Sequence, residues 1–217
     1  YWSPHVNKKV ATVKAVLNSI CSINKYSNIY SAHLINVFGE WSFIKDQNSK
    51  IKVYDLFLSK NFKFKSSATG FLKSRFIYLF TGFFSFFSLL NLIKKQKPDY
   101  IIIHLITYIP LILSNLFKLD TKFILRISGY PKLTFFRKLL WKSSSKNLFK
   151  IFCPTQETLN NLLKENIFPK EKLFLLEDPI LDISKIKKLQ KEPIPDFLKK
   201  SKFILAIGRF SKQKNYK

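Results

Sequence analysis

The feature that most constrains the fold is a regular alternation of short apolar runs with longer helical patterns. The clearest run, YIIIHLI at 100–106, is continuous and rich in β-branched residues, which is typical of a strand buried on both faces. Further runs predict strands at 30–37, 51–57, 122–128, 148–153, 172–177 and 202–207. Helices are predicted near 9–22, 72–95, 109–118, 134–145, 155–165 and 183–190. Because such elements are joined by right-handed crossovers, the alternation predicts an α/β fold with a doubly wound parallel sheet.

A proline-rich segment at 192–200 is the best candidate for a linker. Pro193 and Pro195 resist both helix and sheet, and a lysine pair follows them. We therefore predict a Rossmann-like domain over 1–191 and the start of a second, truncated Rossmann-like domain at 201–217. The chain contains no methionine and stops before the helix that should follow the predicted strand at 202–207, which favours a fragment.

The charge of the chain has two interpretations, an anionic partner or a codon bias, because Lys, Ile, Asn and Phe all have A+T-rich codons. A formal net charge of +25 over 217 residues attracts nucleic acid, anionic membrane surfaces and phosphorylated ligands. Nearly all the cations are lysine, which recognises bases and phosphates less specifically than arginine. We therefore place an anionic membrane surface above nucleic acid as a partner.

Cysteine usage and the absence of known catalytic motifs narrow the chemistry. Cys21 and Cys153 lie in apolar runs at no metal-binding spacing, which favours buried thiols and a reducing cytoplasm. The sequence contains no HExxH, CxxC pair, P-loop or GxSxG motif. We therefore expect neither a hydrolase nor a metal enzyme, and no cofactor.

Segment 76–93 is rich in phenylalanine and contains no charged residue. By length it is just able to span a bilayer. A narrow polar stripe nevertheless runs along one helical face, through Ser74, Tyr78, Thr81, Ser85 and Ser88. With lysines at both ends, the segment fits a helix lying in a membrane interface. It fits equally well a core helix packed on the sheet, and both interpretations stay open.

The carboxyl ends of the predicted strands carry the best candidates for chemistry, because these ends line one shared cleft in an open parallel sheet. His104 near the end of its strand is either a core histidine or a cleft residue. Arg126 needs an anion close by, which would be a phosphorylated ligand or a buried acid. Gly208, Arg209 and Lys214 follow the strand at 202–207, which places two cations at the same kind of edge.

In this order, the pieces resemble the retaining glycosyltransferases of family four, which have the GT-B fold of two Rossmann-like domains. The most specific motif is AIGRFSKQKNY at 206–216, which is similar to the family's strand-Gly-Arg-Leu/Phe-x-x-x-Lys pattern. Weaker support comes from KPDYIIIH at 97–104, LRISGYP at 125–131, CPTQET at 153–158 and EDPI at 177–180. The family's glycine-rich loop after the first strand is replaced here by SPHVNKK.

The resemblance implies transfer of a sugar from a nucleotide-sugar donor to an acceptor hydroxyl, with retention of configuration and without a metal. It implies that Gly208, Arg209 and Lys214 hold the donor diphosphate and that His104 is catalytic, near the transferred sugar. Facing the acceptor or the reacting centre would be His5, Asn7, Arg126, Ser128 and Gly129. A lipid-linked or surface-polysaccharide acceptor would suit the basic surface, with the enzyme in the cytoplasm or peripheral on the inner face of the membrane. The fragment alone is expected to be inactive.

Two other functions remain as alternatives. One is a basic membrane-surface module without catalysis. The other is a nucleic-acid-binding domain, for which the alternating Phe and Lys residues at 62–65 are the best local feature.

Overall fold

The computed structural model describes residues 1–5, 11–47, 51–56, 71–179, 183–194, 196–199 and 202, although not every side chain within the helices. The chain divides into two compact units, Tyr1–Pro179 and Ile180–Lys217.

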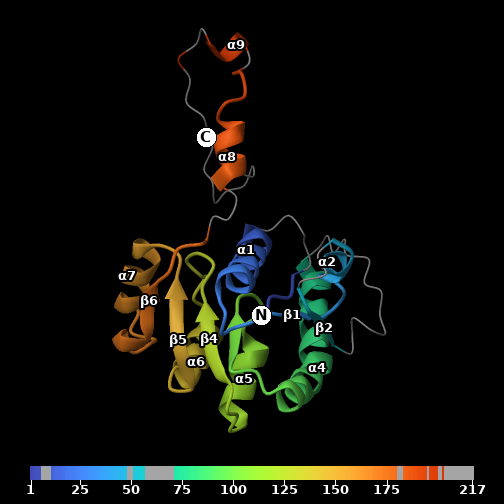
Figure 1. Ribbon diagram of the computed structural model, residues 1–217. Coiled ribbons are helices and arrows are strands. Elements are labelled where there is room, and N and C mark those ends of the chain that lie inside the picture. The colour runs from blue at the N-terminus through green and yellow to red at the C-terminus, as the bar shows by residue number, and fades with distance from the viewer. Residues whose placement is uncertain are drawn as a thin grey trace. The chain divides into compact units, whose positions relative to one another are not determined.

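The first unit is built on parallel β-strands (Figure 1). Strand β1 (Leu34–Asn36) pairs with β2 (Val53–Asp55). A second sheet holds four parallel strands in sequence order: β3 (Tyr100–Ile103), β4 (Lys122–Arg126), β5 (Leu148–Cys153) and β6 (Leu173–Leu175). The predicted α/β class with a parallel sheet is confirmed, although most of the strands are shorter than the apolar runs that predicted them.

Trp2 joins the two sheets. It forms parallel bridges with Ile35 of β1 and with Ile103 of β3. Its backbone N–H donates to the carbonyl of Ile102, and its carbonyl accepts from the N–H of His104, both at 2.9 Å. The order across the molecule is therefore β2, β1, Trp2, β3, β4, β5, β6. Strand order reverses at Trp2, and such a switch point is where open α/β sheets bind ligands.

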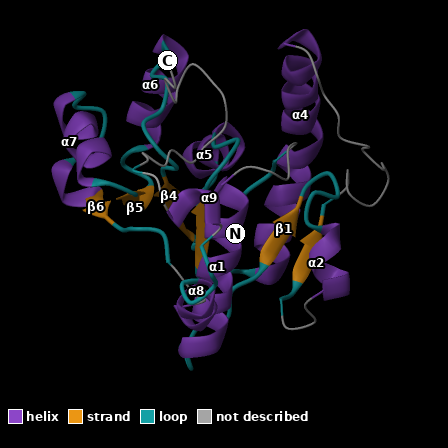
Figure 2. Cartoon of the chain, turned by 90° about the horizontal axis from the view of Figure 1, so that it is seen from above, coloured by secondary structure: helices purple, strands orange, loops and turns teal. Residues whose placement is uncertain are grey.

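Helices cover both sides of these strands. Figure 2 shows α4 (Phe71–Gln96), α5 (Tyr108–Leu116), α6 (Phe135–Ser144) and α7 (Gln156–Lys164) on one side, and α1 (Ala11–Tyr26) on the other. All five agree with predicted helices to within a few residues. Two short elements were not predicted, because they span less than two turns: α2 (Ser42–Gln47) and the 3₁₀ helix η1 (Lys170–Lys172).

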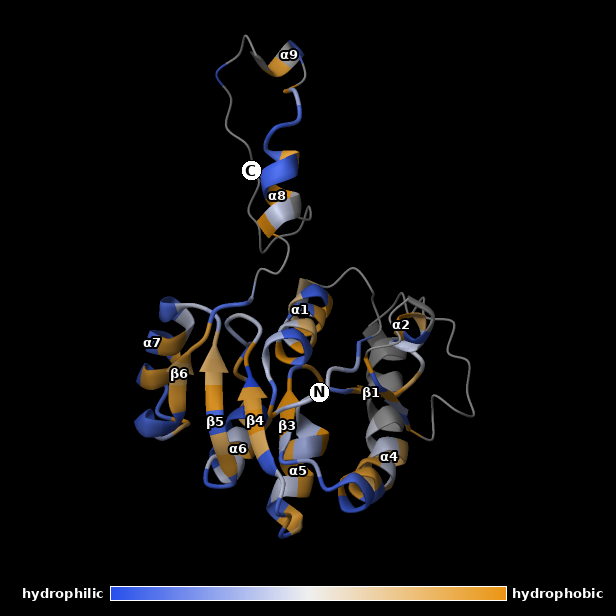
Figure 3. Ribbon diagram, in the orientation of Figure 1, coloured by the Kyte–Doolittle hydropathy of each residue, from blue (hydrophilic) through white to orange (hydrophobic). Residues whose placement is uncertain are grey.

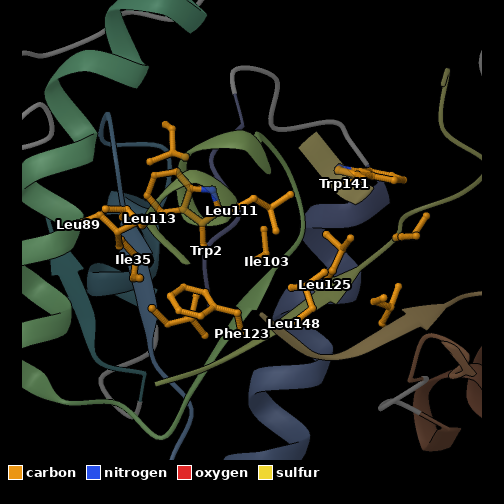
Figure 4. Close-up of a cluster of buried hydrophobic side chains, with 14 of the residues drawn as sticks. Trp2, Ile35, Leu89, Ile103, Leu111, Leu113, Phe123, Leu125, Trp141 and Leu148 are labelled. Carbon is orange, nitrogen blue, oxygen red and sulfur yellow. The ribbon is translucent and has the colours of Figure 1, made fainter. Parts of the chain in front are cut away.

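The main core lies between the four-stranded sheet and the layer of α4 to α6. The strands are mostly hydrophobic along their length (Figure 3). Trp2 is fully buried, and Figure 4 shows it among core side chains that include Ile103, Leu111 and Leu113. A smaller cluster packs α1 and α2 against β1, with Trp41 fully buried in it. Trp2 is therefore part of the packed core.

The described part of α4 is a core helix. Leu89, Leu90 and Ile93 are buried in the main core, whereas Phe83 and Phe87 are exposed. Ser85, one of the predicted polar stripe, is completely buried, so at this residue the stripe faces the protein rather than a polar surface. Among the residues that the structure describes, no helix has the length and apolarity needed to cross a bilayer.

The second unit contains α8 (Ile183–Leu189), as predicted, and the single-turn helix α9 (Asp196–Lys199) inside the predicted linker. The predicted strand at 202–207 lies outside the described residues, apart from Lys202. The division after Pro179 comes before the predicted linker. A second domain beginning at 201 stays a prediction.

Candidate functional site

A pocket of about 800 Å³ opens at the carboxyl ends of β3 and β4, beside the switch point at Trp2. The residues that follow these two strands form much of its wall, and α6 forms another side. The pocket gathers five of the residues predicted for the cleft, which are His5, His104, Arg126, Ser128 and Gly129. Asn7, Gly208, Arg209 and Lys214 lie outside the described residues, so their predicted roles stay predictions.

His104 is the first residue after β3 and is buried. Its ring stacks on that of Tyr1, with 5.8 Å between the centroids and 25° between the planes. Neither ring nitrogen has a hydrogen-bond partner in the described part of the chain. Burial, and then the charge of Arg126, lower the pKa of His104 to about 3. At neutral pH the ring is therefore neutral, with one nitrogen able to donate and the other able to accept a hydrogen bond.

Arg126 is the last residue of β4 and supplies a buried positive charge to the same pocket. Its Nη2 donates to Oδ1 of Asp178 at 2.6 Å. The carboxylate predicted by sequence is thus present, but it is not a buried acid, because 55% of the Asp178 side chain is exposed. The buried Nη1 has no partner among the described residues. One donor of the guanidinium therefore remains for a ligand.

His5, in the segment that follows Trp2, also forms part of the pocket wall. Its ring packs edge-on against Trp41, with 4.6 Å between the centroids and 78° between the planes. Its Nδ1 lies 3.2 Å from the carbonyl oxygen of Ser3. The side chain is therefore held by its surroundings before any ligand binds.

The loop after β4 turns the chain from the sheet into α6. Gly129 has a φ of +106°, in the region that favours glycine, and nothing lies within 4 Å of the place where a Cβ would be. The glycine is thus required by the backbone and not by crowding. Thr134 then caps α6, because its side chain accepts from the N–H of Arg137.

The apolar side of the pocket was missed by sequence reasoning. It is formed by Ile106, Tyr108, Phe136, Leu140 and Trp141. Tyr108 can occupy this place because α4 has a glycine opposite: a Cβ on Gly82 would lie 2.7 Å from the Tyr108 hydroxyl. Tertiary packing of α4, α5 and α6 brings these residues together, and no local sequence motif predicts this packing.

The remaining titratable groups nearby are structural. Burial raises the pKa of Cys153 to about 11, so this thiol is unreactive at neutral pH. Cys153 is buried as predicted, whereas Cys21 is only partly buried. In the described ranges, no three His, Cys, Asp or Glu side chains are grouped to hold a metal ion. The predicted metal-free chemistry stays a prediction.

A scan against known protein families finds no match for this chain, and a search of curated proteins finds none either. We therefore infer the function from the pocket and from the sequence motifs.

Proposed function

We propose that the chain forms the acceptor-side part of a retaining glycosyltransferase that uses a nucleotide-sugar donor. The observation that supports this most is the pocket beside Trp2, which combines a neutral histidine with a buried arginine. Both side chains have nitrogen atoms without a hydrogen-bond partner in the described part of the chain. A ligand rich in hydroxyl and phosphate oxygens complements these atoms, because a buried polar group left unpaired costs about 1–3 kcal/mol.

In the proposed reaction, His104 orients a hydroxyl group of the sugar by hydrogen bonding. The sugar leaves its diphosphate as negative charge builds on that group, and Arg209 and Lys214 stabilise the charge. A histidine with a pKa of about 3 is a poor base. The proton of the attacking acceptor hydroxyl therefore passes to an oxygen of the leaving diphosphate, which is the stronger base.

The apolar wall of the pocket favours a lipid-linked saccharide as the acceptor. Phe136, Leu140 and Trp141 line the pocket together with Arg126, which supplies a positive charge to the same pocket. An acceptor with a phosphate group and a hydrocarbon chain matches this combination. We accordingly place the protein in surface-polysaccharide assembly, in the cytoplasm or on the inner face of the membrane.

The test is glycosyl transfer by the full product of the gene that encodes this chain. We expect transfer from a radiolabelled nucleotide sugar to a lipid-linked acceptor, with the anomeric configuration retained as read by NMR. His104→Ala should lower kcat about 10- to 100-fold, because it removes a hydrogen bond at the reacting sugar.

The matched control is His33→Ala, which removes a histidine near the start of β1 that does not line this pocket. Equal rates for the two variants would contradict the role of His104. Absence of transfer from every nucleotide sugar offered would contradict the proposed function itself.

A further inference from the structure

The start of α6 presents an aromatic and basic surface at the mouth of the pocket. We call it the α6 patch, and it consists of Tyr130, Phe135, Phe136 and Leu139 together with Lys132, Arg137 and Lys138. Phe135 and Phe136 are 74% and 80% exposed. Phe136 also lines the pocket, so the patch and the pocket are continuous.

These two phenylalanines are held in place although they are exposed. Their rings meet edge to face, with 5.7 Å between the centroids. The capping bond from Thr134 fixes the first turn of the helix, and Nη1 of Arg137 donates to the carbonyl of Lys132 at 2.7 Å. The aromatic side chains are thus presented to solvent by an ordered helix. Large aromatic surfaces exposed in this way indicate an interaction site.

Charge identifies the kind of partner. Residues 130–144 contain four basic residues and no acidic residue. Lys138 forms an ion pair with Glu165, the C-cap residue of α7. Lys132 forms no ion pair in the described part of the chain. Lysine and arginine beside phenylalanine suit a membrane interface, where the cations meet lipid phosphates and the rings enter the acyl boundary.

The contrast with α4 favours α6 for this role. Phe83 and Phe87 of α4 are also exposed, at 71% and 62%. However, the next basic residues along that helix are Lys94 and Lys95, about two turns further on. On α6 the cations lie within the same turns as the phenylalanines.

We propose that the α6 patch docks on an anionic lipid bilayer and thereby brings the mouth of the pocket to the membrane. The docking follows from the exposed surface alone. Its purpose, the capture of a lipid-linked acceptor, rests on the proposed function.

Sedimentation with vesicles tests the docking. The chain should bind vesicles that contain phosphatidylglycerol. Its binding should be at least about tenfold weaker to vesicles of phosphatidylcholine alone, and also to the anionic vesicles in 0.5 M salt. The double variant Phe135→Ser/Phe136→Ser should bind the anionic vesicles at least about tenfold more weakly than the parent. The matched control, Phe83→Ser/Phe87→Ser, removes two equally exposed rings from the neighbouring helix and should change binding less than about twofold. An α6 variant that binds like the parent, or an α4 variant that loses binding equally, would overturn the proposal.

A fluorescence measurement locates the contact independently of affinity. Trp2, Trp41 and Trp141 are all buried, so they contribute little quenching by a bilayer. The variant Phe136→Trp should be quenched by brominated lipids and shift its emission to the blue, whereas Phe87→Trp should show neither change. Equal quenching of the two reporters would contradict docking through α6. Neither vesicle experiment involves a nucleotide sugar, so failure of the docking leaves glycosyl transfer untouched, and failure of transfer leaves the docking untouched.

Discussion

The carboxyl ends of the strands differ sharply on the two sides of Trp2. At the end of β1, Asn36 is paired: it donates to Asp55 at 2.7 Å and accepts from the N–H of Trp41 at 3.0 Å. After β3 and β4, nitrogen atoms of His104 and Arg126 are buried without partners in the described part of the chain. The first arrangement stabilises a loop, and the second leaves binding capacity for a ligand. Trp41 Nε1, on the β1 side, is also buried without a partner among the described residues, but Trp41 does not line the pocket. Unpaired buried polarity therefore indicates a site only where it also borders a pocket.

Among the substitutions that test this difference between the two sides of Trp2, replacing Arg126 should have the largest effect. In the full gene product, Arg126→Met should lower kcat/KM of the proposed glycosyl transfer about 100-fold, because it removes the buried positive charge from the pocket. The free energy of unfolding should change by less than about 1 kcal/mol, because the partner Asp178 is half exposed and stays solvated. Initial rates together with denaturant unfolding check both values. A large loss of stability with unchanged transfer would make Arg126 a structural residue.

A second test uses pH, because each side of Trp2 contains one buried group that prefers to be neutral. Burial raises the pKa of Glu40 from 4.5 to about 7, although the Val37 and Phe38 N–H groups donate to its carboxylate. Burial lowers the pKa of His104 from 6.5 to about 3. Between pH 4.5 and 6.5, folded Glu40 holds a proton that the unfolded chain has lost, so its contribution to stability falls as pH rises. Unfolded His104 holds a proton that the folded chain lacks, so its contribution rises with pH.

The free energy of unfolding of the two single variants should therefore change in opposite directions between pH 4.5 and 6.5. From pH 4.5 to 6.5, the free energy of unfolding should rise by about 2–3 kcal/mol in Glu40→Gln and fall by about the same amount in His104→Gln. Glu165→Gln serves as the control and should leave the slope of the parent in place, because that carboxylate pairs with Lys138 at the surface. Urea unfolding at several pH values gives the slopes. Parallel slopes for Glu40→Gln and His104→Gln would show that the two groups are not buried as described.

The smallest expected effect comes from the paired side of Trp2. Asn36→Ala should lower the free energy of unfolding by about 2 kcal/mol, because it removes three hydrogen bonds and leaves the buried N–H of Trp41 without its acceptor. The proposed glycosyl transfer by the folded, full gene product should stay within about twofold of the parent, as measured below the unfolding transition. Asn91→Ala, which removes an exposed asparagine from α4, is the control for stability. A selective loss of transfer in Asn36→Ala would move part of the site to the β1 side.

Sequence alone predicted the helices, the parallel strands and the gathering of His104, Arg126 and Gly129 at one edge. These follow from local periodicity and from the rule that parallel strands end on the same side. It did not predict that Asp178 pairs with Arg126, because the two residues come from different strand ends that only the folded sheet brings together. Nor did it find Phe136 and Trp141 in the pocket wall, or the burial of Ser85. Which face of a helix is buried depends on the elements that pack against it in the folded chain.

Trp2 ties the pocket to the far half of the molecule. Its backbone bonds to β3 on one side and bridges to β1 on the other, and its carbonyl receives the N–H of His104. The indole Nε1 adds a bond to the carbonyl of Ile106, which lies in the pocket wall. Tyr1 adds a second link, because its carbonyl accepts the N–H of Ile35 in β1 and its ring stacks on that of His104. The first two residues of the chain thus connect β1 directly to the wall of the pocket.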